Sequence, residues 1–390
     1  MKNFILHKSN LSILIFYFFF AFTSIISIIL AEYNNNITPT LFLKQLIFFI
    51  FSFGIIYFMQ NISVHTYEKI SILLFIISII LLVLLLIAPV SIAPVINGAK
   101  AWFNFKLFSF QPSEIAKVTT VILVSSLITK EHFRTSSDIL KLIQVAIITI
   151  IPFILIIKEN DTGNALYFVC LFLVLAFLVS NRSKTFLVIY SFVIGFLAIV
   201  IGSAIYVPNL LIKIGIRDYQ IKRLLSWINP NDYINDYSYQ ITLALNEVKK
   251  AGISGSFEKN VTYIPEQYND FIFTVIAKNF GFIGAAIFIL IYFIFIIKVL
   301  RIAKSCQHGN FSYYFLLLAS FSIAYSFLMN SYSATGIIPV IGVSMPFISY
   351  GGSSLLANSI LLGIVLKINK TIYDERMEDY YEENEFDNYE

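Results

Sequence analysis

The acidic residues best placed for chemistry lie where a long polar segment meets a long apolar one. Glu266 and Asp270 directly precede the apolar run 271–300, which is long enough to cross a bilayer. A carboxylate at the edge of a membrane is costly unless it is paired, hydrated or used. Asp270 is therefore a candidate functional residue. The alternative, of equal weight from the residues alone, is that Asn269 or Asp270 caps the next helix by accepting its free backbone N–H groups.

A second polar group stands at the start of another apolar run. Glu114 and Lys117 are three residues apart, so on a helix they share one face and can pair. Ser113, preceded by Pro112, is expected to be the N-cap of that helix. An ion pair that only holds the helix end and a pair with a function fit this spacing equally well.

A tight polar turn, Glu159-Asn160-Asp161-Thr162-Gly163, carries two more acids between apolar runs. Asp161 is expected to cap the helix that follows it. The residues alone favour this structural role over a catalytic one.

The basic residues cluster in a segment with helical periodicity. Between 211 and 227 apolar residues recur at helical spacing, and the polar interruptions are Lys213, Arg217, Lys222 and Arg223. This pattern is typical of an amphipathic helix in the headgroup layer of a membrane. Such a helix either binds anionic lipid in general or groups its cations around a phosphate or pyrophosphate.

The elements that must position these residues are membrane helices. The chain has 390 residues, of which 58% are hydrophobic and 13% charged, and this composition excludes a soluble enzyme. Apolar runs of about twenty residues recur from end to end. The expected fold is an all-α polytopic membrane protein of about ten transmembrane helices, at 11–31, 41–61, 70–90, 113–129, 142–157, 163–180, 185–207, 271–299, 311–329 and 353–366.

The loop charges predict the orientation. Loops rich in Lys and Arg alternate with loops that have few, which places both termini in the cytoplasm by the positive-inside rule. The first span is expected to be an uncleaved anchor. One transmembrane domain, 1–366, then contains a large extracytoplasmic loop, 208–270, between the seventh and eighth spans. The acidic segment 367–390 is expected to be a disordered cytoplasmic tail.

Two features of the later spans indicate an irregular interior. Glycines and prolines break the segment 330–354, which includes Ser349 and Tyr350. Broken backbone at membrane depth is tolerated where it is buried in protein or lines a wet cavity. Lys278 and Asn279 interrupt the eighth span and are expected to face the bundle interior.

The outer face thus combines acids with cations, and this suits a lipid-phosphate substrate. A carboxylate can accept a proton from an attacking sugar hydroxyl, and cations can stabilise a departing pyrophosphate. The residues allow a lipid-linked glycosyltransferase, a lipid flippase or an ion-coupled transporter. The acids are Glu114, Glu159, Asp161, Glu266 and Asp270, and the cations are Lys100, Lys117, Arg217, Lys222 and Arg223. No nucleotide loop, haem motif, zinc spacing or nucleic-acid-binding module occurs in the sequence, and Cys170 and Cys306 form no metal or disulfide pattern.

Over about residues 40–366 the chain resembles the SEDS family of peptidoglycan polymerases, which includes RodA, FtsW and SpoVE. The resemblance rests on short stretches that occur in family order. They include Asn97-Gly98-Ala99, Gln111-Pro112-Ser113-Glu114, Asp161-Thr162-Gly163, Asn229-Pro230, Ile264-Pro265-Glu266, Asp270-Phe271-Ile272-Phe273 and Pro346-Phe347-Ile348-Ser349-Tyr350-Gly351-Gly352-Ser353-Ser354.

This resemblance implies a peptidoglycan glycosyltransferase in the cytoplasmic membrane. It would polymerise lipid II, an undecaprenyl-pyrophosphate-linked disaccharide peptide, into glycan strands on the outer face. The sequence 263–267 favours RodA, and so cell elongation and shape, over the division protein FtsW. The implied partners are a class B penicillin-binding protein and other membrane proteins of the elongation complex, without nucleic acid.

The resemblance also assigns roles to residues. Asp270 matches the essential aspartate of the family, as the base or as the ligand of a divalent cation, Mg²⁺ or Mn²⁺; no organic cofactor is implied. The implied substrate-binding residues are Glu114, Lys117, Lys100, Arg223, Asp161, Glu266, Ser349 and Tyr350.

Two departures from the family pattern keep alternatives open. Thr262 stands where the family usually has a glutamate, and Lys278-Asn279 replaces an acidic pair. The alternatives are a lipid II flippase, or a catalytically impaired scaffold of the wall-synthesis complex.

Overall fold

The computed structural model describes residues 8–96, 98–105, 108–180, 183–213, 218–230 and 238–387, and this part of the chain is mainly helical. Nine of its helices are long and apolar enough to cross a membrane. They are α1 (Lys8–Asn34), α2 (Leu41–Asn61), α3 (Val64–Ile87), α4 (Pro112–Thr129), α6 (Asp138–Lys158), α7 (Thr162–Val179), α12 (Ile272–Ser305), α13 (Phe311–Ala334) and α14 (Gly352–Asp387). The tenth expected span, 185–207, corresponds to α8 (Ser183–Tyr206). The prediction of an all-α polytopic membrane protein is confirmed.

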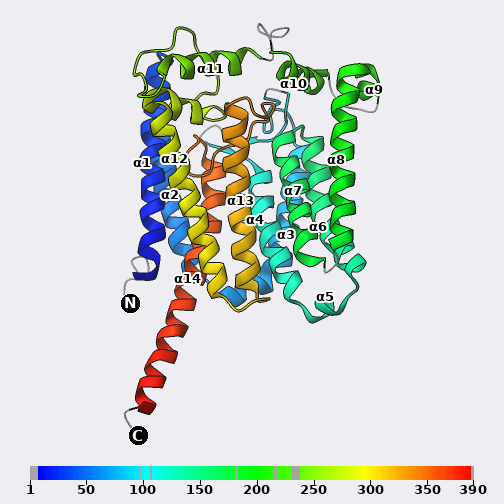
Figure 1. Ribbon diagram of the computed structural model, residues 1–390, viewed down its shortest axis with the longest axis vertical. Coiled ribbons are helices and arrows are strands. Elements are labelled where there is room, and N and C mark those ends of the chain that lie inside the picture. The colour runs from blue at the N-terminus through cyan, green and yellow to red at the C-terminus, as the bar shows by residue number, and fades with distance from the viewer. Residues whose placement is uncertain are drawn as a thin grey trace.

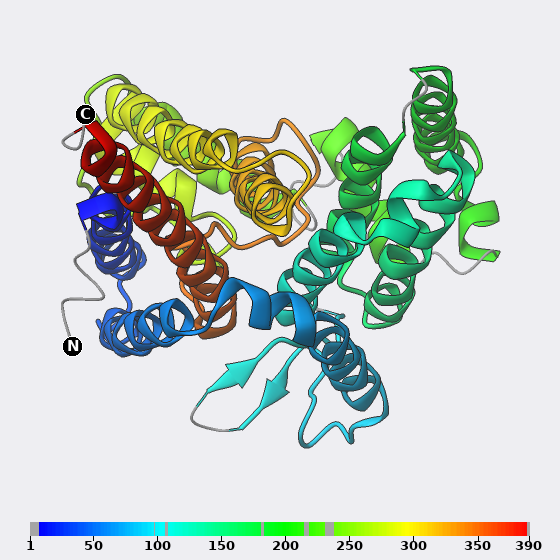
Figure 2. The same ribbon diagram turned by 90° about the horizontal axis from the view of Figure 1, so that it is seen from below.

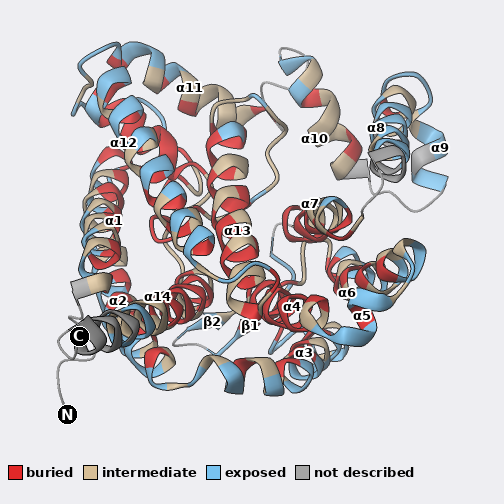
Figure 3. Cartoon of the chain, turned by 60° about the horizontal axis from the view of Figure 1, so that its bottom comes forward, coloured by how far each residue is buried: buried red, intermediate tan, exposed pale blue. Residues whose placement is uncertain are grey.

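The spans form two groups that meet at α4 and α13. Seen along the bundle, α1, α2, α12, α13 and α14 lie on one side, and α3, α4, α6, α7 and α8 on the other (Figure 2). Hydroxyl groups connect the helices: Tyr167 of α7 bonds Ser322 of α13 at 2.6 Å, and Thr119 of α4 bonds Ser78 of α3 at 2.8 Å. Helices α4, α13 and α14 are the most enclosed of the candidate spans, whereas the outward faces of the peripheral spans are exposed (Figure 3). Those exposed faces are apolar, as lipid contact requires.

Short helices cover one end of the bundle (Figure 1). They belong to the large loop and comprise α9 (Pro208–Lys213), α10 (Asp218–Ile228) and α11 (Tyr239–Ala251). The amphipathic segment 211–227 is helical where it is described, as predicted. Arg217 lies outside the described residues. The remaining elements are α5 (Glu131–Thr135) at the opposite end and an antiparallel hairpin, β1 (Phe103–Asn104) with β2 (Ser109–Phe110), which the all-helical prediction did not include.

Helix α12 is broken at Gly281, whose φ of 66° interrupts the helical backbone. The segment after α11 packs into this break: the N–H of Phe282 donates to the carbonyl of Gly252 at 3.1 Å, and the N–H of Ser256 donates to that of Lys278 at 2.8 Å. A Cβ at Gly281 would lie 2.2 Å from the carbonyl oxygen of Ile253, so only glycine fits. The break therefore ties the outer loop to the membrane domain.

The acidic tail differs from its prediction. Instead of becoming disordered after 366, α14 continues to Asp387 and projects beyond the bundle (Figure 1). The segment contains neither glycine nor proline, and extending an existing helix costs far less than nucleating a new one. The expected broken segment before α14 is confirmed, because no helix or strand occurs between Gly336 and Gly351.

Candidate active site

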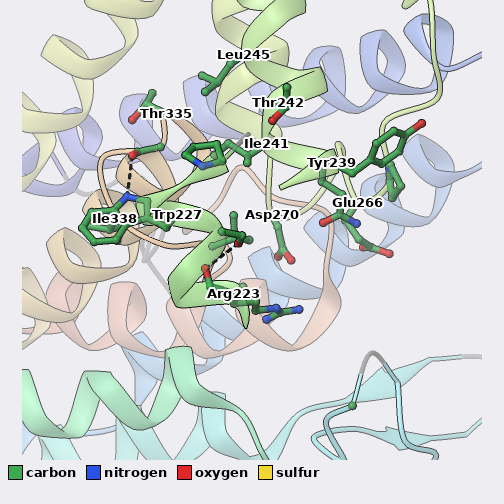
Figure 4. Close-up of a pocket in the computed structure, with 18 residues that line it drawn as sticks. Arg223, Trp227, Tyr239, Ile241, Thr242, Leu245, Glu266, Asp270, Thr335 and Ile338 are labelled. Carbon is green, nitrogen blue, oxygen red and sulfur yellow. Dashed lines mark hydrogen bonds between the residues drawn. The ribbon is translucent and has the colours of Figure 1, made fainter. Parts of the chain in front are cut away.

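Two adjoining cavities lie beneath the outer helices and gather residues from distant parts of the chain. The first, of about 410 Å³, is lined by most of the predicted site residues: Glu114, Asp161, Arg223, Glu266, Asp270 and Tyr350. The second, of about 630 Å³, extends towards α10 and α11, where Trp227 and Tyr239 line it (Figure 4). Both cavities share Arg223, Glu266 and Asp270. Asp270 therefore stands at the junction of two cavities whose sizes suit a substantial ligand.

Asp270 belongs to the loop before α12 and does not cap that helix. The N-cap is Phe271, and no side chain makes a capping hydrogen bond there. The alternative that Asn269 or Asp270 is simply an N-cap is therefore wrong. The backbone turns back on Glu266, whose carbonyl accepts from the N–H of Asn269 at 3.0 Å, and Glu266 has a φ of 53°, which is unusual for a non-glycine residue. A strained backbone of this kind is often found at functional sites.

Two buried side chains hold this loop by its backbone. The amide of Asn330 donates to the carbonyl of Asp270 at 3.2 Å and to that of Val343 at 2.8 Å. The hydroxyl of Ser349 donates to the carbonyl of Asn269 at 2.8 Å and accepts from the N–H of Met345 at 2.9 Å. Ser349 therefore fixes the loop, and it is not among the residues that line either cavity. The loop is held without using the carboxylate of Asp270.

The surroundings of Asp270 raise its pKa to about 7, chiefly because burial disfavours the charged form. The negative charge of Glu266 raises the pKa further, the positive charge of Arg223 lowers it, and Asp161 adds a smaller increase. In Figure 4 the carboxylate of Asp270 lies between the side chains of Arg223 and Glu266. Burial likewise raises the pKa of Glu266, partly offset by a hydrogen bond with Asn269. A carboxylate that titrates near neutral pH is suited to proton transfer.

Asp161 is buried and fully hydrogen-bonded. It caps α7, as predicted: one carboxylate oxygen accepts from the N–H of Asn164 at 3.1 Å. The other oxygen accepts from the amides of Gln111 at 2.7 Å and Asn164 at 2.8 Å. These bonds join the starts of α4 and α7. Burial nevertheless raises the pKa of Asp161. Gln111 and Asn164 were not predicted as site residues, because an uncharged amide between apolar runs carries little signal.

Glu114 and Lys117 form the predicted ion pair, with 2.8 Å between Nζ and Oε1. Both side chains are buried, and the ammonium lies 5.6 Å from the centre of the Tyr167 ring. Glu114 reaches the first cavity, whereas Lys117 is not among the residues that line it. The helix begins at Pro112, which occupies its first turn, and Gln111 is the N-cap, so the assignment of Ser113 as N-cap is wrong.

Lys100 lies apart from the other predicted residues. Its ammonium donates to the carbonyls of Leu86 at 2.8 Å and Ala88 at 2.6 Å, where α3 ends. A lysine in this position satisfies free carbonyls of the last helical turn. Lys100 therefore caps the C-terminal end of α3, and it does not line either of the two cavities.

A buried polar cluster lies behind the Asp270 loop and centres on Lys278, which is 2% exposed. Its ammonium lies 3.3 Å from the carboxylate of Glu247 in α11 and donates to the carbonyl of Glu258 at 2.7 Å and to the side chain of Asn260. The amide of Asn260 donates to Asn35 at 2.8 Å. This cluster ties together α1, α11, α12 and the loop that carries Asp270. Lys278 is therefore buried, but its ammonium faces α11 and the outer loop and not the bundle interior that was expected.

No group of three or more potential metal-ligating side chains, from His, Cys, Asp and Glu, occurs among the described residues. This part of the chain therefore offers no complete set of protein ligands for a metal ion. A single carboxylate such as Asp270 remains a candidate ligand, since Mg²⁺ is commonly held by one or two carboxylates together with substrate phosphates.

Comparison with known proteins covers nearly the whole chain. Residues 6–374 match the family of cell cycle proteins FtsW, RodA and SpoVE. The probable peptidoglycan glycosyltransferase FtsW of Borreliella burgdorferi is 30% identical over 336 residues, which are 85% of this chain and 87% of that protein. Stage V sporulation protein E of Bacillus subtilis is 28% identical over 331 residues, 84% of this chain and 86% of that protein.

Solved structures share the fold. A chain from the solved structure of a peptidoglycan synthase complex has a TM-score of 0.75 at 22% identity, and the match covers 93% of this chain and 98% of that chain. The crystal structure of the rod shape determining protein RodA of Thermus thermophilus has a TM-score of 0.67 at 21% identity, covering 93% of this chain and 97% of its own.

Proposed function

Because this chain belongs to the FtsW, RodA and SpoVE family of cell cycle proteins, we propose that it is a peptidoglycan glycosyltransferase that polymerises lipid II. The observation that carries the proposal is Asp270, a carboxyl whose pKa of about 7 places its titration near neutral pH, at the junction of two cavities. The curated relatives named as peptidoglycan glycosyltransferases support the same activity.

In the proposed reaction, a sugar hydroxyl of one substrate attacks the anomeric carbon of another. A new C–O bond forms, the bond from that carbon to the pyrophosphate breaks, and the lipid pyrophosphate leaves with the electron pair. Asp270 accepts the hydroxyl proton in its ionised form. Arg223, which lines both cavities, offsets the negative charge of the departing pyrophosphate.

The other predicted residues would support this step by position. Asp161 and its amide partners join the starts of α4 and α7, and Glu114 presents its carboxylate to the cavity. Tyr350 lines the same cavity and is a candidate contact for the sugar. We further propose that Asp270 binds a divalent cation, Mg²⁺ or Mn²⁺, together with the pyrophosphate, which would neutralise negative charge there. Activity measured with and without divalent cation tests this addition.

The membrane placement is also a proposal. The loop charges support a cytoplasmic membrane with both termini in the cytoplasm and the cavities on the outer side. A class B penicillin-binding protein is the proposed partner, supported by the fold shared with a chain of a peptidoglycan synthase complex. Other membrane proteins of the elongation complex would join them.

The proposed cellular role is elongation. The sequence 263–267 and the fold shared with a rod shape determining protein support it, while curated relatives carry the names of division and sporulation proteins. Depletion in the native host separates the roles. Rounded cells would support elongation, and filaments would assign the chain to division.

The proposed activity is tested with purified wild type and Asp270→Asn, each with a candidate class B partner, labelled lipid II and divalent cation. Wild type is expected to produce glycan ladders on gels, and the variant to lose about 10² to 10⁴-fold in rate, as for removal of a general base. Both proteins must show the same partner binding. Equal ladders would remove Asp270 from catalysis. A folded, partner-bound wild type without ladders would favour the scaffold, or the flippase if vesicles then show headgroup translocation.

A further inference from the structure

A third cavity, of about 450 Å³, lies at the opposite end of the bundle from Asp270. Its walls come from the start of α1, the end of α12 and the part of α14 that leaves the bundle. These three segments lie together in both views (Figures 1 and 2). Three of its lining residues are cations: Lys298, Arg301 and Arg376. No carboxylate belongs to the described lining, although acids occur nearby on α14 at Asp374 and Glu375.

One face of α12 changes from apolar to cationic along this cavity. Ile294 and Ile297 line the cavity first, and Lys298 and Arg301 line it further along the helix. Successive lining residues are separated by one helical turn or less, so they lie along one side of α12. Ile294 and Ile297 are each 45% exposed, on the surface that faces the membrane. Seven residues of helix span roughly 10 Å. This is the order in which a phospholipid presents its groups, acyl chain towards the bilayer centre and phosphate at the surface.

Hydrogen bonds between α1 and α14 hold the walls of the cavity together. The amide of Asn369 in α14 donates to the carbonyl of Ser9 at 2.9 Å and to the side chain of Asn10 at 2.8 Å. Asn10 in turn donates to the carbonyl of Leu366 at 3.1 Å. Ser9 and Asn369 both line the cavity. The angle between α1 and α14 is thereby set before any ligand arrives, so binding does not have to order these helices.

We propose that this cavity is a binding site for the phosphate headgroup of an anionic membrane phospholipid. Arg301 and Arg376 supply planar donors for phosphate oxygens, Lys298 adds a compact charge, and the isoleucines and Phe16 contact the first part of the acyl chains. Basic cavities between membrane helices on the cytoplasmic side are suited to such headgroups. The site lies far along the bundle from the proposed active site and does not depend on that function.

The test is a titration of the full-length protein, in neutral detergent, with phosphatidylglycerol or phosphatidylcholine of identical acyl chains. Native mass spectrometry counts the bound lipids. We expect phosphatidylglycerol to bind at least about tenfold more tightly, and the double variant Arg301→Ala/Arg376→Ala to remove this preference. Lys304→Ala is the matched control, because this cation is exposed at the same end of α12 but does not line the cavity. Arg301→Lys is expected to keep part of the preference.

Other outcomes would overturn the proposal. Equal binding of the two lipids, or an unchanged preference in the double variant with equal melting temperature, would exclude the site. Competition by millimolar inorganic phosphate as effective as that by the lipid would identify a simple anion site. Loss of partner binding in the double variant, with lipid preference intact, would reassign the surface to a protein. If the alanine variant does not fold, Arg301→Gln/Arg376→Gln provides the same comparison.

Discussion

Two clusters of charge stand on either side of one loop, and they are organised in opposite ways. Behind the loop, Lys278 is paired with Glu247 and hydrogen-bonded to Asn260. In front of it, Asp270 and Glu266 share a cavity with Arg223, and neither acid has an ion-pair partner within 4 Å among the described residues. Charge is matched in the first cluster and left in excess in the second.

The difference separates a structural cluster from a reactive one. In the matched cluster the pKa of Glu247 is lowered: burial alone would raise it, but hydrogen bonds and charges from Lys250 and Lys278 outweigh burial. In the unmatched cluster, burial and the like charge of Glu266 raise the pKa of Asp270 to about 7. Perturbed carboxylates of the second kind are typical of functional sites. The Lys278 cluster connects α11 and α12 to the loop that carries Asp270.

The largest expected effect comes from breaking the matched cluster. Glu247→Ala leaves Lys278 buried without its counter-charge, and a broken buried pair costs about 3 kcal/mol in the free energy of unfolding. Thermal melting of the purified protein measures the loss. Lys250→Ala is the control, because Lys250 pairs with the same glutamate but its side chain is 59% exposed. This variant is expected to lose less than about 1 kcal/mol in the free energy of unfolding. Equal losses in the two variants would mean that the buried pair is not what holds this region.

A second prediction concerns how the ionisation of Asp270 affects the stability of the folded protein. The pKa of Asp270 in the folded protein, about 7, exceeds its ordinary value of 3.8. Its contribution to stability is therefore present below about pH 4 and is lost as pH rises through 7. Asp270→Asn stays neutral, so its stability relative to wild type is expected to grow by on the order of 2 kcal/mol between about pH 5 and pH 8.

Melting temperatures across this pH range measure the effect. Glu258→Gln is the control, because it neutralises an exposed acid in the same outer loop. A variant Asp270→Asn that is less stable than wild type at the higher pH would contradict the conclusion that burial and the charge of Glu266 disfavour the ionised form of Asp270.

A third and smaller effect is expected from the two charged neighbours of Asp270. If Asp270 is the base, polymerisation rises with pH through its pKa. Glu266→Gln removes a charge that raises this pKa, and Arg223→Gln removes one that lowers it. The midpoint of the pH–rate profile is therefore expected to move down in the first variant and up in the second, by roughly one pH unit or less. Shifts in the same direction, or none, would show that another group controls the profile.

The pairing of Lys278 accounts for one of the two departures from the family pattern. Lys278-Asn279 stands where the resemblance implies an acidic pair. The structure brings Glu247 of α11 to 3.3 Å from the lysine. The added positive charge is therefore compensated locally and does not enter the cavities that Asp270 lines. This weakens the argument that Lys278 indicates a catalytically impaired chain.

The sequence alone determined the membrane architecture, because runs of apolar residues long enough for a bilayer have few other uses. Interactions between residues close in the chain are also predicted correctly: Asp161 caps α7, and Glu114 pairs with Lys117 three residues later. Both interactions join residues close in the chain, so spacing predicts them. The length of α14 was misjudged, since composition alone does not reveal whether an existing helix will continue.

Which of these residues act together depends on how distant segments of the chain pack. Arg223, Asp161 and Asp270 come from separate segments, and their shared cavity depends on how α4, α7, α10 and the loop before α12 pack. The sequence also does not predict that Lys100 bonds the end of α3 and stays outside the cavity lining, or that Lys278 pairs with Glu247. The pKa of a side chain depends on its burial and on charges from distant segments, and the local sequence predicts neither of them.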